Sequence, residues 1–106
     1  MTTKQTPDVS VEIDGCTVEI YTNRLPGMSW RCGYVTFPES DKLTPGVDYE
    51  HVGGIPVNGR ITYHEGRTLG WDYNHSFNMR NNSTLPGDET VFDDAKKLIA
   101  WMRRLR

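Results

Sequence analysis

The segment from Val9 to Tyr21 constrains the fold most, because apolar and polar side chains alternate on both sides of Asp14-Gly15. An alternation of period two is typical of half-buried strands. Asp-Gly is favoured at the centre of a two-residue hairpin turn, where both residues need a positive φ. The sequence therefore predicts an antiparallel β-hairpin with Val11 and Val18 among its apolar positions.

The apolar pattern changes period near the C-terminal end. Between Val91 and Leu105 the apolar residues are spaced by three or four positions, which is typical of an amphipathic helix. Acidic residues precede basic residues in this segment, as the helix dipole favours. Thr90 and Asp93 predict an acidic variant of the capping box. Trp101 lies off the apolar stripe, so it is interpreted either as a contact at the rim of the domain or as part of a partner surface.

Further strands are expected in residues 30–37, within residues 55–64 and in residues 69–73. In the second of these, alternation predicts Ile61 and Tyr63 on one face and Arg60, Thr62 and His64 on the other. Prolines and glycines predict loops at residues 38–54 and 74–87. The chain is thus expected to have an α+β fold, an antiparallel β-sheet with an N-terminal hairpin, packed by one C-terminal amphipathic helix.

The length of 106 residues fits a flexible N-terminus at residues 1–8 and one α+β domain at residues 9–106. The net charge of −2 argues against a DNA or RNA duplex as partner. No apolar stretch is long enough for a membrane span, and no secretory signal opens the chain. We therefore expect a cytoplasmic protein, with no membrane partner and with Cys16 and Cys32 as free thiols.

The familiar catalytic and phosphate-binding motifs are absent from the sequence. The closest approach to a metal site is Asp72-x-x-His75, and a single pair of this kind is a weak signal. Cys32 is expected to be a packed thiol and not a nucleophile. No catalytic residue, metal ligand or cofactor is predicted, and the protein is not expected to be an enzyme.

Aromatic side chains are numerous in the middle of the chain and stand among arginine, histidine and asparagine residues. Flat rings beside guanidinium groups suit a planar, anionic ligand such as a nucleotide, whose base stacks while its phosphate pairs with arginine. The alternative is that these rings form the core, where aromatics supply much of the buried area. The residues of this set are Trp30, Tyr34, Tyr49, Arg60, Tyr63, His64, Trp71, Tyr73 and His75.

Four ordered motifs cover roughly the middle half of the chain: Cys32-Gly33-Tyr34-Val35, Asp48-Tyr49, Asn58-Gly59-Arg60-Ile61-Thr62-Tyr63 and Gly70-Trp71-Asp72-Tyr73-Asn74-His75. In this order they resemble a widespread family of small bacteriophage proteins. Asn58, Arg60 and Tyr73 stand where that family usually has His, Gly and Cys. A metal site built from that His and Cys would be weakened here.

The resemblance implies an immune-evasion protein of the kind that binds a cyclic nucleotide signal of bacterial defence (anti-CBASS or anti-Thoeris) without cleaving it. Such proteins are usually homo-oligomers with pockets at subunit interfaces, and they act in the host cytoplasm. The expected ligand-binding residues are Arg31, Tyr34, Asn58, Arg60, Tyr63, His64, Trp71, Asp72 and His75. Arginines would pair with phosphate, rings would stack on the base, and the remaining side chains would bind base or ribose edges.

Two other functions stay open at this point. The protein could inhibit a host factor by direct binding through Trp101 and the C-terminal helix. A small metal-assisted hydrolase centred on His64, Asp72 and His75 is the less favoured alternative.

Overall fold

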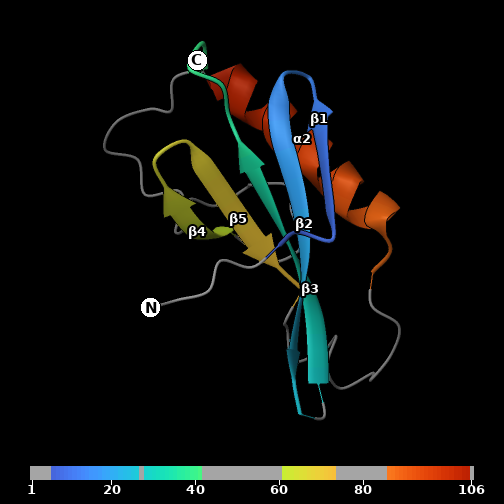
Figure 1. Ribbon diagram of the computed structural model, residues 1–106. Helices are drawn as coiled ribbons and strands as arrows, with labels where there is room; N and C mark the ends of the chain where they lie inside the picture. Colours follow the sequence, from blue (N-terminus) through green and yellow to red (C-terminus); the bar gives the residue numbers. More distant parts are fainter. Residues whose placement is uncertain (1–5, 27, 42–60, 74–85, 106) are drawn as a thin grey trace.

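The computed structural model of the protein describes residues 6–26, 28–41, 61–73 and 86–105. Within them, five strands form one antiparallel sheet in the order β1-β2-β3-β5-β4, and helix α2 packs on one face (Figure 1). The elements are β1 (Val9–Ile13), β2 (Cys16–Leu25), β3 (Met28–Thr36), β4 (Ile61–Glu65), β5 (Thr68–Asp72) and α2 (Asp88–Leu105). The predicted α+β fold is confirmed.

The N-terminal hairpin forms as the Asp-Gly turn predicts. Asp14 and Gly15 both have positive φ, 50° and 85°, and they join β1 to β2 with Ile13 opposite Cys16. A primed turn of this kind twists the two strands in the sense that sheets prefer. The hairpin therefore sets the register of the first two strands locally, before any long-range contact is needed.

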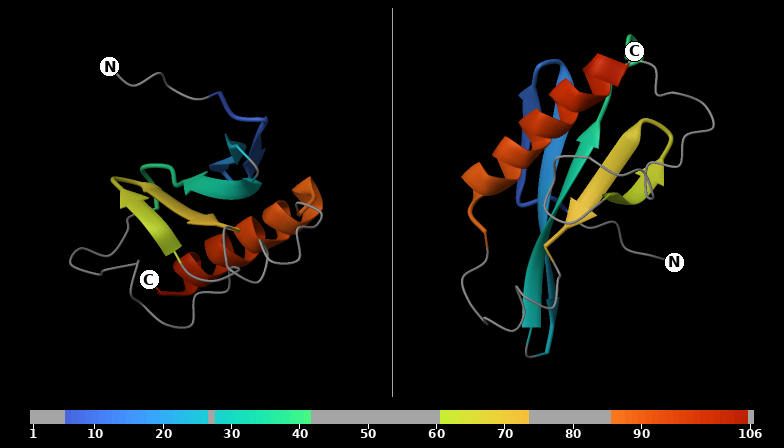
Figure 2. Two further views of the ribbon diagram at one scale, coloured as in Figure 1. Left: turned by 90° about the horizontal axis from the view of Figure 1, so that it is seen from below. Right: turned by 180° about the vertical axis from the view of Figure 1, so that it is seen from behind.

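Helix α2 covers one face of the sheet, as the views from below and from behind show (Figure 2). Alternate residues of β2, β3 and β5 and the apolar stripe of α2 meet there. Burying a large apolar side chain contributes about 1.5–3 kcal/mol to stability. The buried cluster is Cys16, Val18, Ile20, Val35, Phe37, Ile61, Leu69, Trp71, Tyr73, Val91, Ala95, Leu98, Ile99 and Met102.

Trp71 fits beneath the helix because the residue opposite it on β3 is Gly33. A Cβ atom on Gly33 would lie 2.7 Å from the Trp71 ring and 2.9 Å from Val91. The missing side chain therefore lets the indole and the first turns of α2 approach the strand closely. Trp101 is half-buried and packs against the same core. This agrees with its interpretation as a contact at the rim of the domain.

The expectation that Ile61 and Tyr63 share a face is wrong. The register shifts between them, with Ile61 opposite Trp71 and Tyr63 opposite Gly70. A bulge of this kind places two residues of one strand against one of its partner and breaks the alternation. Ile61 is accordingly fully buried on the helix face, whereas Tyr63 is 37% exposed on the other face.

The capping prediction at Thr90 is also wrong. The helix begins at Asp88, and the backbone N–H groups of Thr90 and Val91 donate to the Gly87 carbonyl at 3.1 and 3.4 Å. Thr90 is therefore inside the first turn, where it cannot act as the cap. The predicted charge order along the helix is confirmed, with Asp88 and Glu89 in the first turn and Arg103 and Arg104 in the last.

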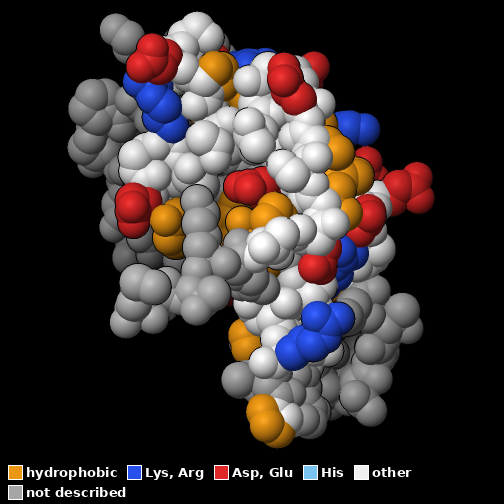
Figure 3. All heavy atoms as spheres, viewed as in Figure 1, with side chains coloured by type: hydrophobic (Ala, Val, Ile, Leu, Met, Phe, Trp, Pro, Cys, Tyr) orange, Lys and Arg blue, Asp and Glu red, His pale blue; other side chains and the backbone are white. Residues whose placement is uncertain are grey.

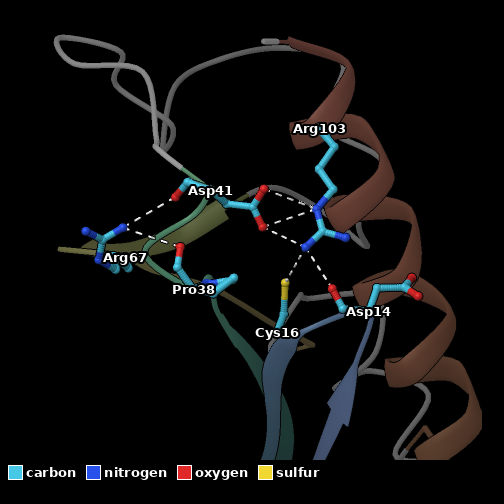
Figure 4. A network of polar contacts seen from close by, with 6 residues as sticks. All are labelled: Asp14, Cys16, Pro38, Asp41, Arg67 and Arg103. Carbon is cyan, nitrogen blue, oxygen red and sulfur yellow. Dashed lines mark hydrogen bonds and ion pairs between the residues drawn. The ribbon is translucent and has the colours of Figure 1, made fainter.

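Arg103, in the last turn of α2, joins three parts of the domain (Figure 4). Its Nη2 lies 2.6 Å from the buried Asp41 carboxylate, and it also donates to the Asp14 carbonyl at 2.7 Å. Arg67, from the β4–β5 turn, donates to the carbonyls of Pro38 and Asp41 at 3.4 Å. These contacts fasten the chain after β3 to the helix and to the β4–β5 turn, and they fasten the helix to the β1–β2 turn.

The predicted flexible N-terminus, residues 1–8, lies mostly outside the described residues. Asp8 accepts a hydrogen bond from Thr22 Oγ1 at 2.5 Å, and its backbone N–H donates to the Ile20 carbonyl at 2.7 Å. The predicted loops at 38–54 and 74–87 and the first part of the strand expected in 55–64 fall largely outside them as well. Among the described residues, no helix is both long enough and apolar enough to cross a membrane.

Candidate functional site

The sheet face opposite α2 carries three tyrosines from three different strands. Tyr21 lies opposite Cys32, while Tyr34 and Tyr63 both lie opposite Gly70, from β3 and β4 respectively. Because directly opposed residues share a face, these rings stand on one surface, which we call the tyrosine face. In the space-filling view of this face, hydrophobic side chains gather near the middle with carboxylates among them (Figure 3).

The three rings pack edge to face in a row. The Tyr21 and Tyr34 centroids are 5.4 Å apart at 88°, and those of Tyr34 and Tyr63 are 5.3 Å apart at 87°. Edge-to-face pairs at such distances contribute about 0.5–1.5 kcal/mol beyond the area they bury. Burial raises the pKa of Tyr34 to about 12, so this central phenol stays protonated in neutral solution. The row is therefore a neutral, ordered aromatic surface.

Gly70 holds the central ring close to the sheet. A Cβ at this position would lie 2.6 Å from two carbons of the Tyr34 ring and 3.2 Å from the Tyr63 Cβ. Gly33 opposite Trp71 and Tyr34 opposite Gly70 are consecutive pairs in the register. Each glycine thus accepts one aromatic ring, on opposite faces of the same two strands.

Polar groups border the rings on this face. Asn23 Nδ2 donates to Cys32 Sγ at 3.5 Å, and the thiol donates to the Tyr21 carbonyl at 3.9 Å. Burial raises the pKa of Cys32, which keeps it a thiol and disfavours nucleophilic chemistry. Thr62 Oγ1 donates to Asp72 Oδ2 at 3.4 Å. The face thus presents aromatic carbon with a carboxylate acceptor, a combination that suits flat rings bearing N–H or O–H donors.

Three of the predicted site residues come together on the tyrosine face: Tyr34, Tyr63 and Asp72. His64 lies opposite the buried Leu69, which puts it on the helix side of the sheet, away from Asp72. His64 and Asp72 therefore do not form the shared site that a metal-assisted hydrolase would need. The predicted residues Asn58, Arg60 and His75 lie outside the described residues.

Arg31 and Trp71 are on the helix side and serve the fold. The Arg31 guanidinium lies 2.7 Å from Asp88 and 3.7 Å from Asp8, and it donates to the Pro86 carbonyl at 3.1 Å. The arginine thereby ties the start of α2 to the N-terminal segment. Trp71 is 1% exposed, and its Nε1 donates to the Tyr73 hydroxyl at 3.0 Å.

The Tyr73 hydroxyl in turn donates to Asp94 of α2 at 2.5 Å. Burial raises the pKa of Tyr73, and the hydrogen bond to Asp94 raises it further. A chain of hydrogen bonds therefore satisfies the polar atoms of both aromatic residues inside the core. Neither ring is presented to a ligand from the helix side.

Sequence reasoning missed Tyr21 as a member of the site. The signal was available, since Tyr21 follows Thr17 and Glu19 on the polar side of the N-terminal hairpin. A bulky ring on that side indicates that the polar face of the hairpin is not purely a solvated surface. The partner ring, Tyr34, is identified only by the pairing of β2 with β3.

No group of three His, Cys, Asp or Glu side chains able to hold a metal ion occurs among residues 6–26, 28–41, 61–73 and 86–105. Both cysteines are free, as predicted, and both are buried. Comparisons with family models, with curated proteins and with solved structures found no match to this chain.

Proposed function

We propose that the protein binds and sequesters a cyclic nucleotide, taking a base of the ligand on the tyrosine face and leaving the ligand uncleaved. The observation that carries this proposal is the row of three edge-to-face tyrosines on the sheet face opposite the helix. Stacking of a base on an aromatic side chain is worth about 1–3 kcal/mol, whatever the base. Rings fixed on paired strands lose little freedom on binding, which favours affinity.

Polar recognition would come from the border of the face. The Asp72 carboxylate can accept hydrogen bonds from the amino group of a base or from a ribose hydroxyl. The phosphate partner we propose is Arg60, which directly precedes Ile61 in the sequence. Arg31, already engaged with Asp8 and Asp88, is not required for this role.

Two observations favour binding without turnover. The buried Cys32 thiol has a raised pKa, and His64 and Asp72 stand on opposite faces of the sheet. A nucleophile or an activated water needs a base within hydrogen-bond reach. From the resemblance of the mid-chain motifs, we further propose a bacteriophage protein that acts as an oligomer in the cytoplasm of the infected cell against a nucleotide defence signal.

A thermal-shift screen against cyclic mononucleotides and cyclic dinucleotides tests the proposal, because a ligand that binds only the native state raises its melting temperature. We expect at least one compound to raise the Tm and to be recovered intact after heat denaturation. Tyr63→Ala should abolish the shift, since Tyr63 is the most exposed ring described on this face at 37%. Trp101→Ala is the matched control, because it removes a half-buried ring from the helix side.

Three outcomes would contradict parts of the proposal. Hydrolysed ligand, with activity lost on chelation, would favour the metal-assisted hydrolase. If Trp101→Ala lost the ligand-induced rise in Tm and Tyr63→Ala kept it, the binding site would lie at the helix. A nucleoside that binds as tightly as its cyclic nucleotide would refute phosphate recognition by Arg60 while leaving the ring site intact.

A further inference from the structure

Strand β1 is one edge of the sheet and pairs with β2 alone among the described strands. Three of its five residues, Ser10, Val11 and Glu12, are exposed, and Val11 retains 36% of its surface. An edge strand presents backbone N–H and C=O groups that can pair with another strand. From Val9 to Ile13 there is no proline, lysine or arginine to oppose such pairing.

The hairpin register tells which backbone groups of β1 are directed outward. In a two-residue hairpin the residues flanking the turn, Ile13 and Cys16, form a hydrogen-bonded pair, and bonded pairs alternate along the strands. The bonded positions of β1 are therefore Val9, Val11 and Ile13. The amides of Ser10 and Glu12 point away from β2.

The β1 strand of a second copy can pair with these outward amides in antiparallel orientation. The two copies are then related by a two-fold axis at Val11. Antiparallel pairing centred there places Ser10 opposite Glu12 of the second copy, and the reverse, so both outward amides on each strand find partners. Val11 then meets Val11 of the second copy in the non-bonded pair, where side chains approach most closely.

Repulsion between acidic side chains of the two copies disfavours the two neighbouring registers. Centring the pair on Glu12 would set two glutamates directly opposite each other. Centring it on Ser10 would set Glu12 against Asp8 of the second copy. Like charges opposed across strands are destabilising, whereas the register centred on Val11 opposes each glutamate with a serine.

We propose that the protein forms a symmetric dimer through antiparallel pairing of two β1 strands, which joins two five-stranded sheets into one. The self-complementary edge makes a closed, isologous interface. The axis is perpendicular to the sheet, so both tyrosine faces lie on the same side. Five strand spacings separate the two Tyr34 positions, roughly 24 Å. Each copy therefore keeps its own tyrosine face, and the proposal stands independently of what that face binds.

Cross-linking tests the register. Under mild oxidation, we expect Val11→Cys to form a disulfide-linked dimer, because the two Val11 positions meet at the axis. Ser10→Cys, one residue away and also exposed, should not cross-link, because its partner is Glu12 of the second copy. The native cysteines are buried, so they contribute little background. Equal cross-linking of both variants would overturn the proposed register.

Sedimentation of the unmodified chain and of charge variants tests the dimer itself. Val11→Lys places two like charges on the axis and should yield a monomer with an unchanged far-ultraviolet circular dichroism spectrum. Ser10→Lys should tighten the dimer by facing Glu12, whereas Ser10→Glu should weaken it. A chain that is monomeric at its highest soluble concentration, or a dimer indifferent to these three changes, would overturn the proposal.

Discussion

Substituting Gly70 by alanine should destabilise the fold by forcing the Tyr34 ring away from the sheet. The new Cβ would lie 2.6 Å from two ring carbons, closer than real Cβ contacts come. The ring cannot step aside freely, because Tyr21 and Tyr63 flank it at 5.4 and 5.3 Å. Overpacking costs about 1–3 kcal/mol, whereas replacing a strand glycine returns about 0.5–1 kcal/mol. We expect a net loss of about 0–2.5 kcal/mol.

A double-mutant cycle separates the clash from the backbone effect. In the Tyr34→Ala background the ring is gone, so Gly70→Ala should be neutral or stabilising by about 0.5–1 kcal/mol. The coupling between the two positions should then be about 1–3 kcal/mol. Urea unfolding followed by circular dichroism measures both free energies, provided that the denaturant slope is unchanged. An equal effect of Gly70→Ala in both backgrounds would show that a clash with the Tyr34 ring is not the cause of the destabilisation.

Two further predictions concern the buried phenol and the Arg103 ion pair. Since burial raises the pKa of Tyr34 from 10 to about 12, the unfolded chain loses this proton first. The contribution of Tyr34 to the unfolding free energy should therefore be complete below pH 10 and should be lost as the pH rises from 10 to 12. Urea midpoints across this range should show a shallower fall for Tyr34→Phe, and an identical profile would contradict the assignment. Arg103→Met should lower the unfolding free energy by about 1–3 kcal/mol, because it removes the guanidinium that pairs with the buried Asp41 carboxylate. Adding Asp41→Asn should recover part of that loss.

Turn residues and apolar periodicity correctly predicted the N-terminal hairpin and the C-terminal helix. The Asp14-Gly15 turn and the alternation around it predicted the hairpin, and the three-to-four spacing near the C-terminus predicted the helix. The start of the helix was misplaced at Thr90, because the Gly87 carbonyl accepts the first bonds instead. Turn chemistry and periodicity act over a few residues, so they can be read from the chain without its tertiary contacts.

The composition of the site depends on pairing between distant strands, and here the sequence was a weaker guide. Tyr34 and Trp71 were grouped as one aromatic set, yet the register places them on opposite faces. The bulge after Ile61 then turned Tyr63 toward the tyrosine face, which strict alternation did not predict. Alternation assigns faces within a strand, whereas the faces of different strands agree only once register and bulges are known.

Chemical-shift mapping during a nucleotide titration tests most directly whether the tyrosine face is the binding surface. With a cyclic nucleotide that raises the Tm, we expect the largest chemical-shift changes on the Tyr34 and Tyr63 rings and on the Gly70 amide, and none on the exposed side of α2. Shifts concentrated on α2, with the three tyrosine rings unmoved at saturation, would contradict this expectation.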